Sequence, residues 1–246
     1  RLTTTGNNNV GIGTDALRAN TTGASNNAFG YNALEKVTTA VENTGIGSAA
    51  LGSLTTGNNN IGIGQSAGNH SIELNGAGNI CIGSYCDSPS TSTNYAIIMG
   101  YDVTGVGTDN FTFGRQSVDS NIAFGATTIT APSDIRLKED IQDEEVGLSF
   151  INELRPVTFR WKKAKDVPSE LNAHEANSEE RVMNGKYNHG FIAQEVKEVI
   201  DRYDLKDGFD MWTEDEADGR QRIGEASLMP LMVKAVQELS AKVEEL

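Results

Sequence analysis

Residues 57–64 read Gly-Asn-Asn-Asn-Ile-Gly-Ile-Gly, and residues 6–13 read Gly-Asn-Asn-Asn-Val-Gly-Ile-Gly. The last glycine of this unit recurs along the first half of the chain, at first every 17 residues and then at spacings of 19, 17, 14 and 11 residues. These anchor glycines are Gly13, Gly30, Gly47, Gly64, Gly83, Gly100, Gly114 and Gly125. Such self-similarity predicts a repeat architecture in which no single unit can bury its own apolar face.

Each repeat contains a run of strand length followed by polar turn residues, and helical periodicity is missing. The array therefore predicts a β-solenoid or β-roll with one rung per unit. A large apolar residue precedes every anchor: Ile12, Phe29, Ile46, Ile63, Ile82, Met99, Phe113 and Phe124. We expect these side chains to be buried within coils or between chains. Because they recur at a fixed phase, we reject the alternative of low-complexity disorder.

The shortening of the repeat after Gly100 predicts a change of form. We assign residues 1–102 to the β repeat shaft and residues 103–132 to a transition region. Residues 109–114 and 120–125 are expected to be strands of that region, interwoven between chains.

Composition divides the chain in the same way. Residues 1–132 hold 20 of the 26 glycines, whereas residues 133–246 hold most of the charge of a chain whose net charge is −14. A chain this acidic, without a cluster of Lys and Arg, is unsuited to nucleic acid or an anionic membrane. No apolar run is long enough to span a bilayer, and we expect no signal peptide. Because the chain opens inside a repeat, we expect it to be the C-terminal part of a longer protein.

Cys81 and Cys86 are the two cysteines, and no histidine lies near enough in the sequence to complete a zinc pattern. They are expected to be small, partly buried thiols of the repeat. The sequence predicts no metal site and no cofactor.

The second half has the periodicities of an α+β domain. Leu148, Ile151 and Leu154 mark one face of a helix that ends before Pro156. Residues 157–161 alternate as a strand, and residues 189–192 form a strand that runs into a helix. Residues 209–212 and 222–223 are expected to form two further strands around an acidic turn at 214–219, and residues 164–188 to form an exposed excursion.

The last segment, 226–246, carries a seam of apolar residues at alternating steps of three and four. The seam consists of Met229, Met232, Val236, Leu239, Val243 and Leu246. It covers under three heptads, so the pattern fits a trimeric coiled coil and an amphipathic helix packed on its own domain about equally well.

Two resemblances extend these inferences. The Asn-x-x-x-Ile-Gly repeat resembles the head repeats of trimeric autotransporter adhesins and the shafts of bacteriophage tail fibres, in which three chains associate. Four blocks also occur in order: Ser-Asp-Ile-Arg-Leu-Lys (133–138), Leu-Arg-Pro-Val-Thr-Phe-Arg-Trp (154–161), Gly-Phe-Ile-Ala-Gln-Glu-Val (190–196) and Leu-Met-Pro-Leu-Met-Val-Lys-Ala-Val-Gln-Glu-Leu (228–239). Together they resemble the auto-cleaving C-terminal intramolecular chaperone domain of phage tail fibres, neck appendages and endosialidase tailspikes. The resemblance covers residues 133–246.

The chaperone resemblance implies that the chain cuts itself at the Pro132–Ser133 bond with a Ser-Lys dyad. Ser133 would be the nucleophile and Lys138 the base. A serine hydroxyl needs a neighbouring base near neutral pH, and a spacing of five residues brings the two side chains together if the segment turns once between them. A serine that only caps a helix and a lysine on a solvated face are the alternative.

Three further residues are candidates for supporting roles. Asp134 is expected to cap and orient the turn that carries the dyad. His189 and Glu195 are weaker candidates, and the more ordinary interpretation of each is structural: a histidine of the domain and a solvated helix carboxylate. The donors of an oxyanion hole cannot be assigned from the sequence.

The predicted function is that of a viral tail-fibre or appendage protein. Its chaperone domain would assemble three shafts and then release itself as a single-turnover serine endopeptidase. The partners would be two further copies of the chain and, through the parent fibre, a host-surface receptor or glycan. The protein would be assembled in the host cytoplasm and reside in the virion. The alternative is an uncleaved trimeric adhesin or receptor-binding tip with a permanent C-terminal cap.

Overall fold

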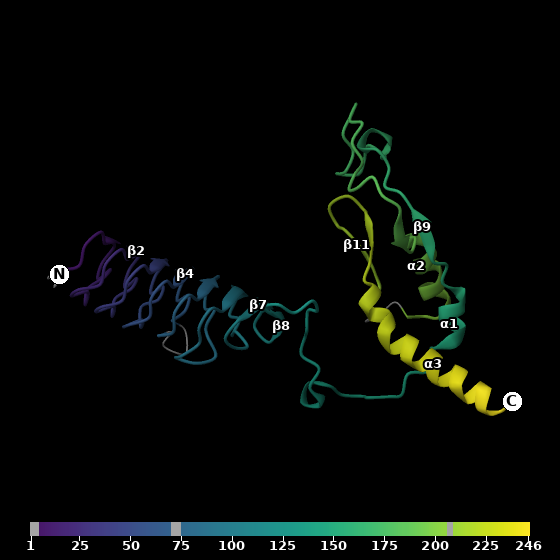
Figure 1. Ribbon diagram of the computed structural model, residues 1–246, viewed down its shortest axis with the longest axis horizontal. Coiled ribbons are helices and arrows are strands. Elements are labelled where there is room, and N and C mark those ends of the chain that lie inside the picture. Colours follow the sequence, from purple (N-terminus) through teal and green to yellow (C-terminus); the bar gives the residue numbers. More distant parts are fainter. Residues whose placement is uncertain (1–4, 70–74, 206–208) are drawn as a thin grey trace. The chain divides into compact units, whose positions relative to one another are not determined.

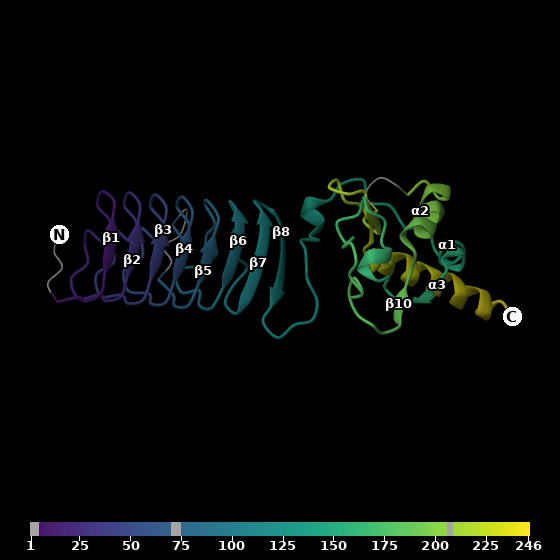
Figure 2. The same cartoon turned by 90° about the horizontal axis from the view of Figure 1, so that it is seen from above.

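The chain forms two compact units in the computed structural model, Arg1–Glu139 and Asp140–Leu246. The structure describes residues 5–69, 75–205 and 209–246. The first unit is a stack of coils, and the second is a small mixed unit of helices and hairpins (Figure 1, Figure 2).

The strands of the first unit lie side by side in chain order. Seven of them pair in parallel: β1 (Val10–Ile12), β2 (Asn27–Phe29), β3 (Thr44–Ile46), β4 (Ile61–Ile63), β5 (Ile80–Ile82), β6 (Ile97–Tyr101) and β7 (Asn110–Arg115). Residues of equal phase are partners in neighbouring strands, so Ile12 lies opposite Phe29 and Phe29 opposite Ile46. The predicted β-solenoid is confirmed.

The stack ends in a hairpin, because β8 (Val118–Ala123) pairs antiparallel with β7. The two strands expected near residues 109–114 and 120–125 are therefore present, although within one chain they form a simple hairpin. Any exchange of strands between chains stays a prediction, as do the domain boundaries after residues 102 and 132.

Small residues and leucines, rather than the large residues before each anchor, fill the interior of the coils. The buried set includes Ala16, Ala33, Ala50 and Ala67, three residues after an anchor, together with the neighbouring Leu17, Leu34 and Leu51. Ile12 is 59% exposed and Phe29 38% exposed. The expectation that the large residues are buried within the coils is wrong. Side chains alternate along a strand, and here the inward positions hold the small residues Gly11, Ala28, Gly45, Gly62 and Cys81, which leave room for Leu34 and Leu51 to pack inside.

The anchor glycines are required by the closeness of adjacent coils. Gly30 has φ of +141°, and a Cβ added there would lie 2.3 Å from the carbonyl oxygen of Gly47 in the next coil. A side chain at this position would therefore push two coils apart.

A column of buried asparagines ties the coils together. The Asn43 N–H donates to Oδ1 of Asn26 at 3.0 Å, and the Asn60 N–H donates to Oδ1 of Asn43 at 2.9 Å. The Asn43 amide also donates to the Gly57 carbonyl at 2.9 Å. The column explains the Asn of each repeat, since a buried backbone group without a partner costs about 1–3 kcal/mol.

The two thiols lie in the same interior. Cys81 and Cys86 are free and fully buried, and the Cys86 thiol donates to the carbonyl of Gly83 at 2.9 Å. They act as core residues of the fifth coil, and their burial is more complete than the sequence predicted.

Within its described residues, the second unit contains three α-helices and two short antiparallel strand pairs. Helix α1 (Leu148–Glu153) leads to strand β9 (Val157–Phe159), which pairs antiparallel with β10 (Asn188–Gly190). Helix α2 (Ala193–Arg202) follows, then the hairpin of β11 (Trp212–Glu214) and β12 (Gln221–Ile223), and finally α3 (Met229–Glu244). The predicted helices of this half are confirmed, and the strands expected at 157–161 and 189–192 are present but end at Phe159 and Gly190. The strand expected at 209–212 lies instead at Trp212–Glu214, so that prediction is displaced toward the acidic turn. The core consists of Phe150, Leu154, Val196, Val199, Ile200, Met211, Leu228 and Leu231.

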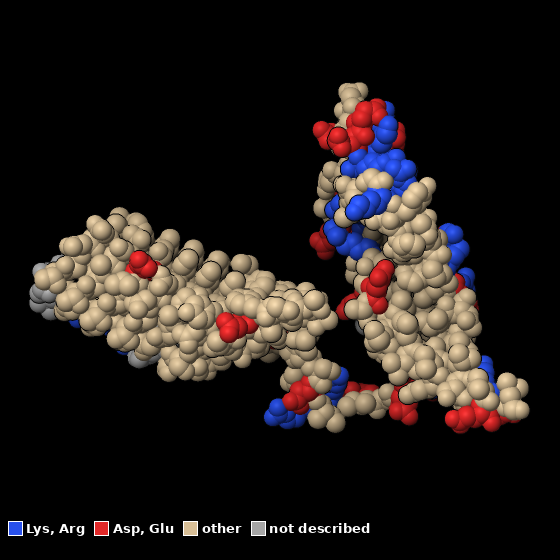
Figure 3. All heavy atoms as spheres, viewed as in Figure 1, with Lys and Arg blue, Asp and Glu red and all other residues tan. Residues whose placement is uncertain are grey.

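Charge is unevenly distributed over the surface. On the face drawn in Figure 3 the first unit shows few charged residues, whereas Lys and Arg gather on the excursion between β9 and β10. Among the described residues, no helix is long and apolar enough to cross a membrane.

Candidate active site

The Ser133–Lys138 pair lies where the shaft unit ends. Lys138 Nζ donates to Ser133 Oγ at 2.8 Å. A single 3₁₀ turn, Ile135–Leu137, separates the two residues and brings their side chains to the same side. The five-residue spacing predicted this contact, whereas the catalytic roles of the two residues stay a prediction.

Asp134 fixes the shape of that turn. Its Oδ1 accepts the N–H of Arg136 at 2.8 Å, and its carboxylate forms an ion pair with the Arg136 guanidinium at 2.5 Å. These hydrogen bonds lower the pKa of Asp134, the side-chain bond from Arg136 having the larger effect. The Lys138 N–H then closes the turn on the Ile135 carbonyl at 3.2 Å. The expected capping role of Asp134 therefore agrees with its contacts.

The turn is open to solvent in the single chain. Ser133 and Lys138 are exposed, and the apolar side chains of Ile135 and Leu137 between them are 72% and 68% exposed. A lysine can accept a proton from serine only when it is neutral, which proteins achieve by burial or by neighbouring cations. Ser133 Oγ and Lys138 Nζ are thus in hydrogen-bond contact, whereas neither residue is buried in the single chain.

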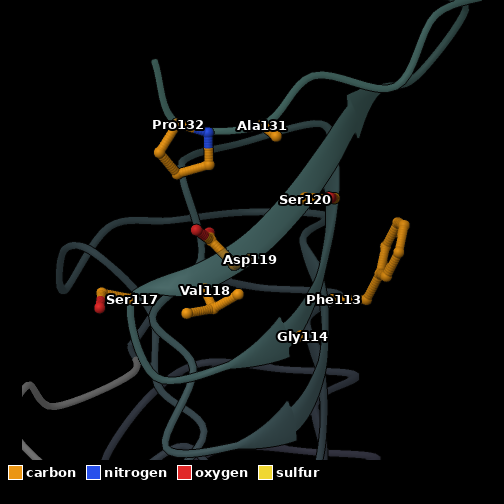
Figure 4. A pocket seen from close by; sticks show the side chains of 8 residues that line it. All are labelled: Phe113, Gly114, Ser117, Val118, Asp119, Ser120, Ala131 and Pro132. Carbon is orange, nitrogen blue, oxygen red and sulfur yellow. The ribbon is translucent and has the colours of Figure 1, made fainter. Parts of the chain in front are cut away.

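The residues that precede the candidate scissile bond border a groove. Ala131 and Pro132 line a depression of about 430 Å³ together with Phe113, Gly114, Ser117, Val118, Asp119 and Ser120 of the β7–β8 hairpin (Figure 4). Pro132 is thus seated against the end of the shaft, whereas Ser133 begins the exposed turn.

His189 and Glu195 have contacts within the second unit. His189 lies in β10, with its Nδ1 at 3.4 Å from Thr158 Oγ1 in β9. Glu195, in the first turn of α2, forms an ion pair with Arg155, and the hydrogen bonds from Arg155 lower the pKa of Glu195. Both residues have structural contacts, and a role at the dyad stays a prediction for each.

Helix α3 packs on its own unit through a face that is distinct from the predicted seam. Leu231 and Ala235 are buried, and Glu238 accepts the N–H of Leu148 at the start of α1 at 2.9 Å. The seam residues are exposed, with values from 47% for Met232 to 65% for Val236 within the helix. α3 thus packs on its own unit, as one of the two interpretations expects, but in the single chain it does so through Leu231 and Ala235 and not through the seam. The formation of a trimer stays a prediction.

The two segments without an assigned role touch each other. Asp218 of the acidic turn accepts the N–H of Asn172 in the excursion at 2.9 Å, and the side chain of Asp218 is almost fully buried. Neighbouring Asp215 binds Arg222 and Arg220, and these hydrogen bonds, Arg222 foremost, hold its pKa at about 2. No sequence signal links residues so far apart.

We expect this contact to resist mild acid. The folded-state pKa of Asp218 is lowered from 3.8, first by the hydrogen bond from the Asn172 N–H, so its carboxylate stabilises the contact fully above that value. The stabilisation is lost as the pH falls through the lowered pKa of Asp218. The NMR resonance of the Asn172 amide should keep its position from pH 7 to 4 and move only below pH 3.8, whereas in Asp218→Asn that transition should be absent. A transition centred above pH 4 would show that the two segments are not held together by this carboxylate.

No cluster of His, Cys, Asp or Glu suited to a metal ion occurs within residues 5–69, 75–205 and 209–246.

Comparison with known families supports one part of the chain. Residues 133–205 match the family model described as the chaperone of endosialidase. The matched segment begins at Ser133 and ends beyond α2, so it covers less than a third of the chain and excludes the shaft, the β11–β12 hairpin and α3. That family is a self-cleaving serine-peptidase type of domain. No curated protein and no solved structure shows a significant match to the chain.

Proposed function

We propose that residues 133–246 are an intramolecular chaperone that assembles three copies of the β shaft and then frees them by cutting the Pro132–Ser133 bond. The observation that carries this proposal is the 2.8 Å contact between Lys138 Nζ and Ser133 Oγ. It stands at the first residue of the segment that matches the endosialidase chaperone model, directly after the shaft.

The proposed cleavage is an N→O acyl shift followed by hydrolysis. Lys138, in its neutral form, removes the proton from Ser133 Oγ, and the oxygen attacks the carbonyl carbon of Pro132. A C–O bond forms, the C–N bond breaks, and Lys138 returns the proton to the released amine of Ser133. Water then hydrolyses the ester, which leaves a carboxylate on Pro132 and restores the hydroxyl. One chain performs this reaction once.

Two exposed apolar surfaces support a homotrimer. The first is the seam of α3. The second, which we call the apolar shaft face, is the outward column in register across β1 to β7: Ile12, Phe29, Ile46, Ile63, Ile82, Met99 and Phe113. Five of the seven side chains are at least 37% exposed in the single chain. A continuous apolar surface of this kind marks a site of association in a soluble protein.

A chaperone domain joined to each shaft would speed the assembly of three shafts. Pairing of distant β segments is slow, and joining three chains at one end raises the effective concentration of their shafts. Cleavage after assembly removes the element that brought the chains together, so the fibre persists because its unfolding is slow. The parent fibre would then carry the shaft on a virion tail fibre or appendage, after assembly in the host cytoplasm, and its partner would be a host-surface receptor or glycan.

The chaperone role is tested by producing the shaft with and without residues 133–246. Residues 1–132 made from the full chain should be recovered as a soluble trimer. The same residues expressed alone should be recovered mainly as aggregate or monomer. Equal yields of trimer from both would show that the shaft needs no chaperone.

Charges placed in the apolar shaft face should prevent the trimer without unfolding the coil. Ile46 and Ile63 are 40% and 37% exposed in the single chain, so Asp is tolerated there by one coil, but three chains would bury six carboxylates. Ile46→Asp combined with Ile63→Asp should reduce the sedimenting species to a monomer with the β-sheet circular dichroism of the parent. Gln65→Asp, at an exposed position outside the column, is the control and should leave the trimer intact. A trimer in the double variant would mean that another face mediates association.

A further inference from the structure

The chain that leads to the scissile bond is hydrogen-bonded to the last strand of the shaft. Thr130 and Asn121 form an antiparallel bridge: each N–H donates to the other's carbonyl at 2.8 Å. The hydroxyl of Thr130 also donates to Oδ1 of Asn121 at 3.1 Å. Thr130 is thus fixed to β8 only three residues before Ser133.

The two residues between this bridge and Ser133 have little freedom. Ala131 and Pro132 border the groove formed by the β7–β8 hairpin, where Val118 and Asp119 lie opposite them (Figure 4). The ring of Pro132 also fixes its own φ near −65°. The chain therefore follows the hairpin as far as Pro132, although both residues stay exposed.

The bridge is connected to the last coil of the shaft through β8. Asn121 lies opposite Thr112 of β7, so the strand that holds Thr130 is itself paired with the last coil.

We propose that the terminal hairpin of the shaft holds the acyl side of the scissile bond, with Thr130 and Asn121 as positioning residues, so that cleavage requires a folded last coil. This inference rests on the proposed self-cleavage. The nucleophile is oriented separately by the Asp134 turn, and the reaction needs the Pro132 carbonyl carbon in line with Ser133 Oγ. Misplacing reacting atoms by about 1 Å lowers a rate by roughly 100-fold.

The test compares two substitutions of one residue. Thr130→Pro removes the N–H that donates to Asn121, whereas Thr130→Ala keeps both backbone hydrogen bonds and loses only the hydroxyl. Cleavage is followed by intact mass during pulse-labelled synthesis of the full chain at several pH values. We expect Thr130→Pro to cleave roughly 100-fold more slowly, with the pH midpoint of the rate unchanged because the dyad is intact. Thr130→Ala should stay within about fivefold of the parent, as expected for one lost hydrogen bond.

Folding is checked in the same substitutions combined with Ser133→Ala, which should have the circular dichroism of the parent. Cleavage of Thr130→Pro at the parental rate would overturn the positioning role. Equal slowing of both variants would also overturn it, because Thr130→Ala keeps the backbone bridge and loses only the hydroxyl. A shifted pH midpoint would overturn it as well, because the change would then act on the dyad. If the parent itself never cleaves, the proposed function fails. If the parent cleaves and Thr130→Pro cleaves equally fast, only the positioning role fails.

Discussion

Replacing Ser133 by alanine should leave one chain of 26.4 kDa, whereas the parent should yield two pieces, residues 1–132 and 133–246. The variant lacks the oxygen that attacks the Pro132 carbonyl, and loss of a catalytic nucleophile lowers a rate by about 10⁴-fold or more. Intact mass of freshly purified protein distinguishes one species from two.

Lys138→Ala should have the same effect, because it removes the base that contacts Ser133 Oγ at 2.8 Å. Asp134→Ala should slow cleavage less, since the turn retains the backbone bonds from Leu137 to Asp134 and from Lys138 to Ile135. Ser149→Ala, at an exposed serine of α1, is the matched control and should cleave as the parent does. A break before residue 133 in the Ser133→Ala protein would mean that the nucleophile has been misassigned.

Leu239→Asp should abolish both trimer formation and cleavage. Leu239 lies in the middle of the seam and is 51% exposed in the single chain, so the fold of the second unit tolerates a carboxylate there. In a trimer the three carboxylates would meet, and burying each unpaired charge costs several kcal/mol, more than a helix of this length offsets. Because Ser133 and Lys138 are exposed in the single chain, we expect the dyad to become active only when assembly covers it.

Sedimentation and a time-course gel of the freshly expressed variant measure both effects. The control must avoid Glu238, whose carboxylate accepts the N–H of Leu148 in α1. Gln237→Glu, at an exposed position outside the seam, serves instead and should leave trimer and cleavage unchanged. Efficient cleavage by a Leu239→Asp monomer would show that the dyad is complete within one chain.

The repeat period determined the register of the solenoid but not the direction of its side chains. The spacing of Gly13 and Gly30 correctly places Ile12 opposite Phe29. Alternation in a strand defines two faces without saying which one is inside, and size was a misleading guide. Coils packed as closely as Gly30 on Gly47 leave space inside for leucines from the turns and for alanines, whereas Ile12, Ile46 and Ile63 lie outside.

At the candidate site, local contacts were predictable and distant ones were not. The Ser133–Lys138 contact follows from one turn of backbone, and the Asp134 cap follows from its position before that turn. The bridge between Thr130 and Asn121 depends on the path of an irregular loop. Such a loop has no periodic sequence pattern from which the contact could be predicted. The seam of α3 left two interpretations open because the sequence does not show that Leu231 and Ala235 already occupy the contact with the second unit.

Native mass spectrometry of the freshly produced parent reports assembly and cleavage in one measurement. We expect a complex of three copies of residues 1–132, each ending in the carboxylate of Pro132, separate from residues 133–246. A single uncut chain of 246 residues in a trimer would contradict the proposed release and favour a permanent C-terminal cap. A cut chain whose residues 1–132 are monomeric would contradict the proposed assembly.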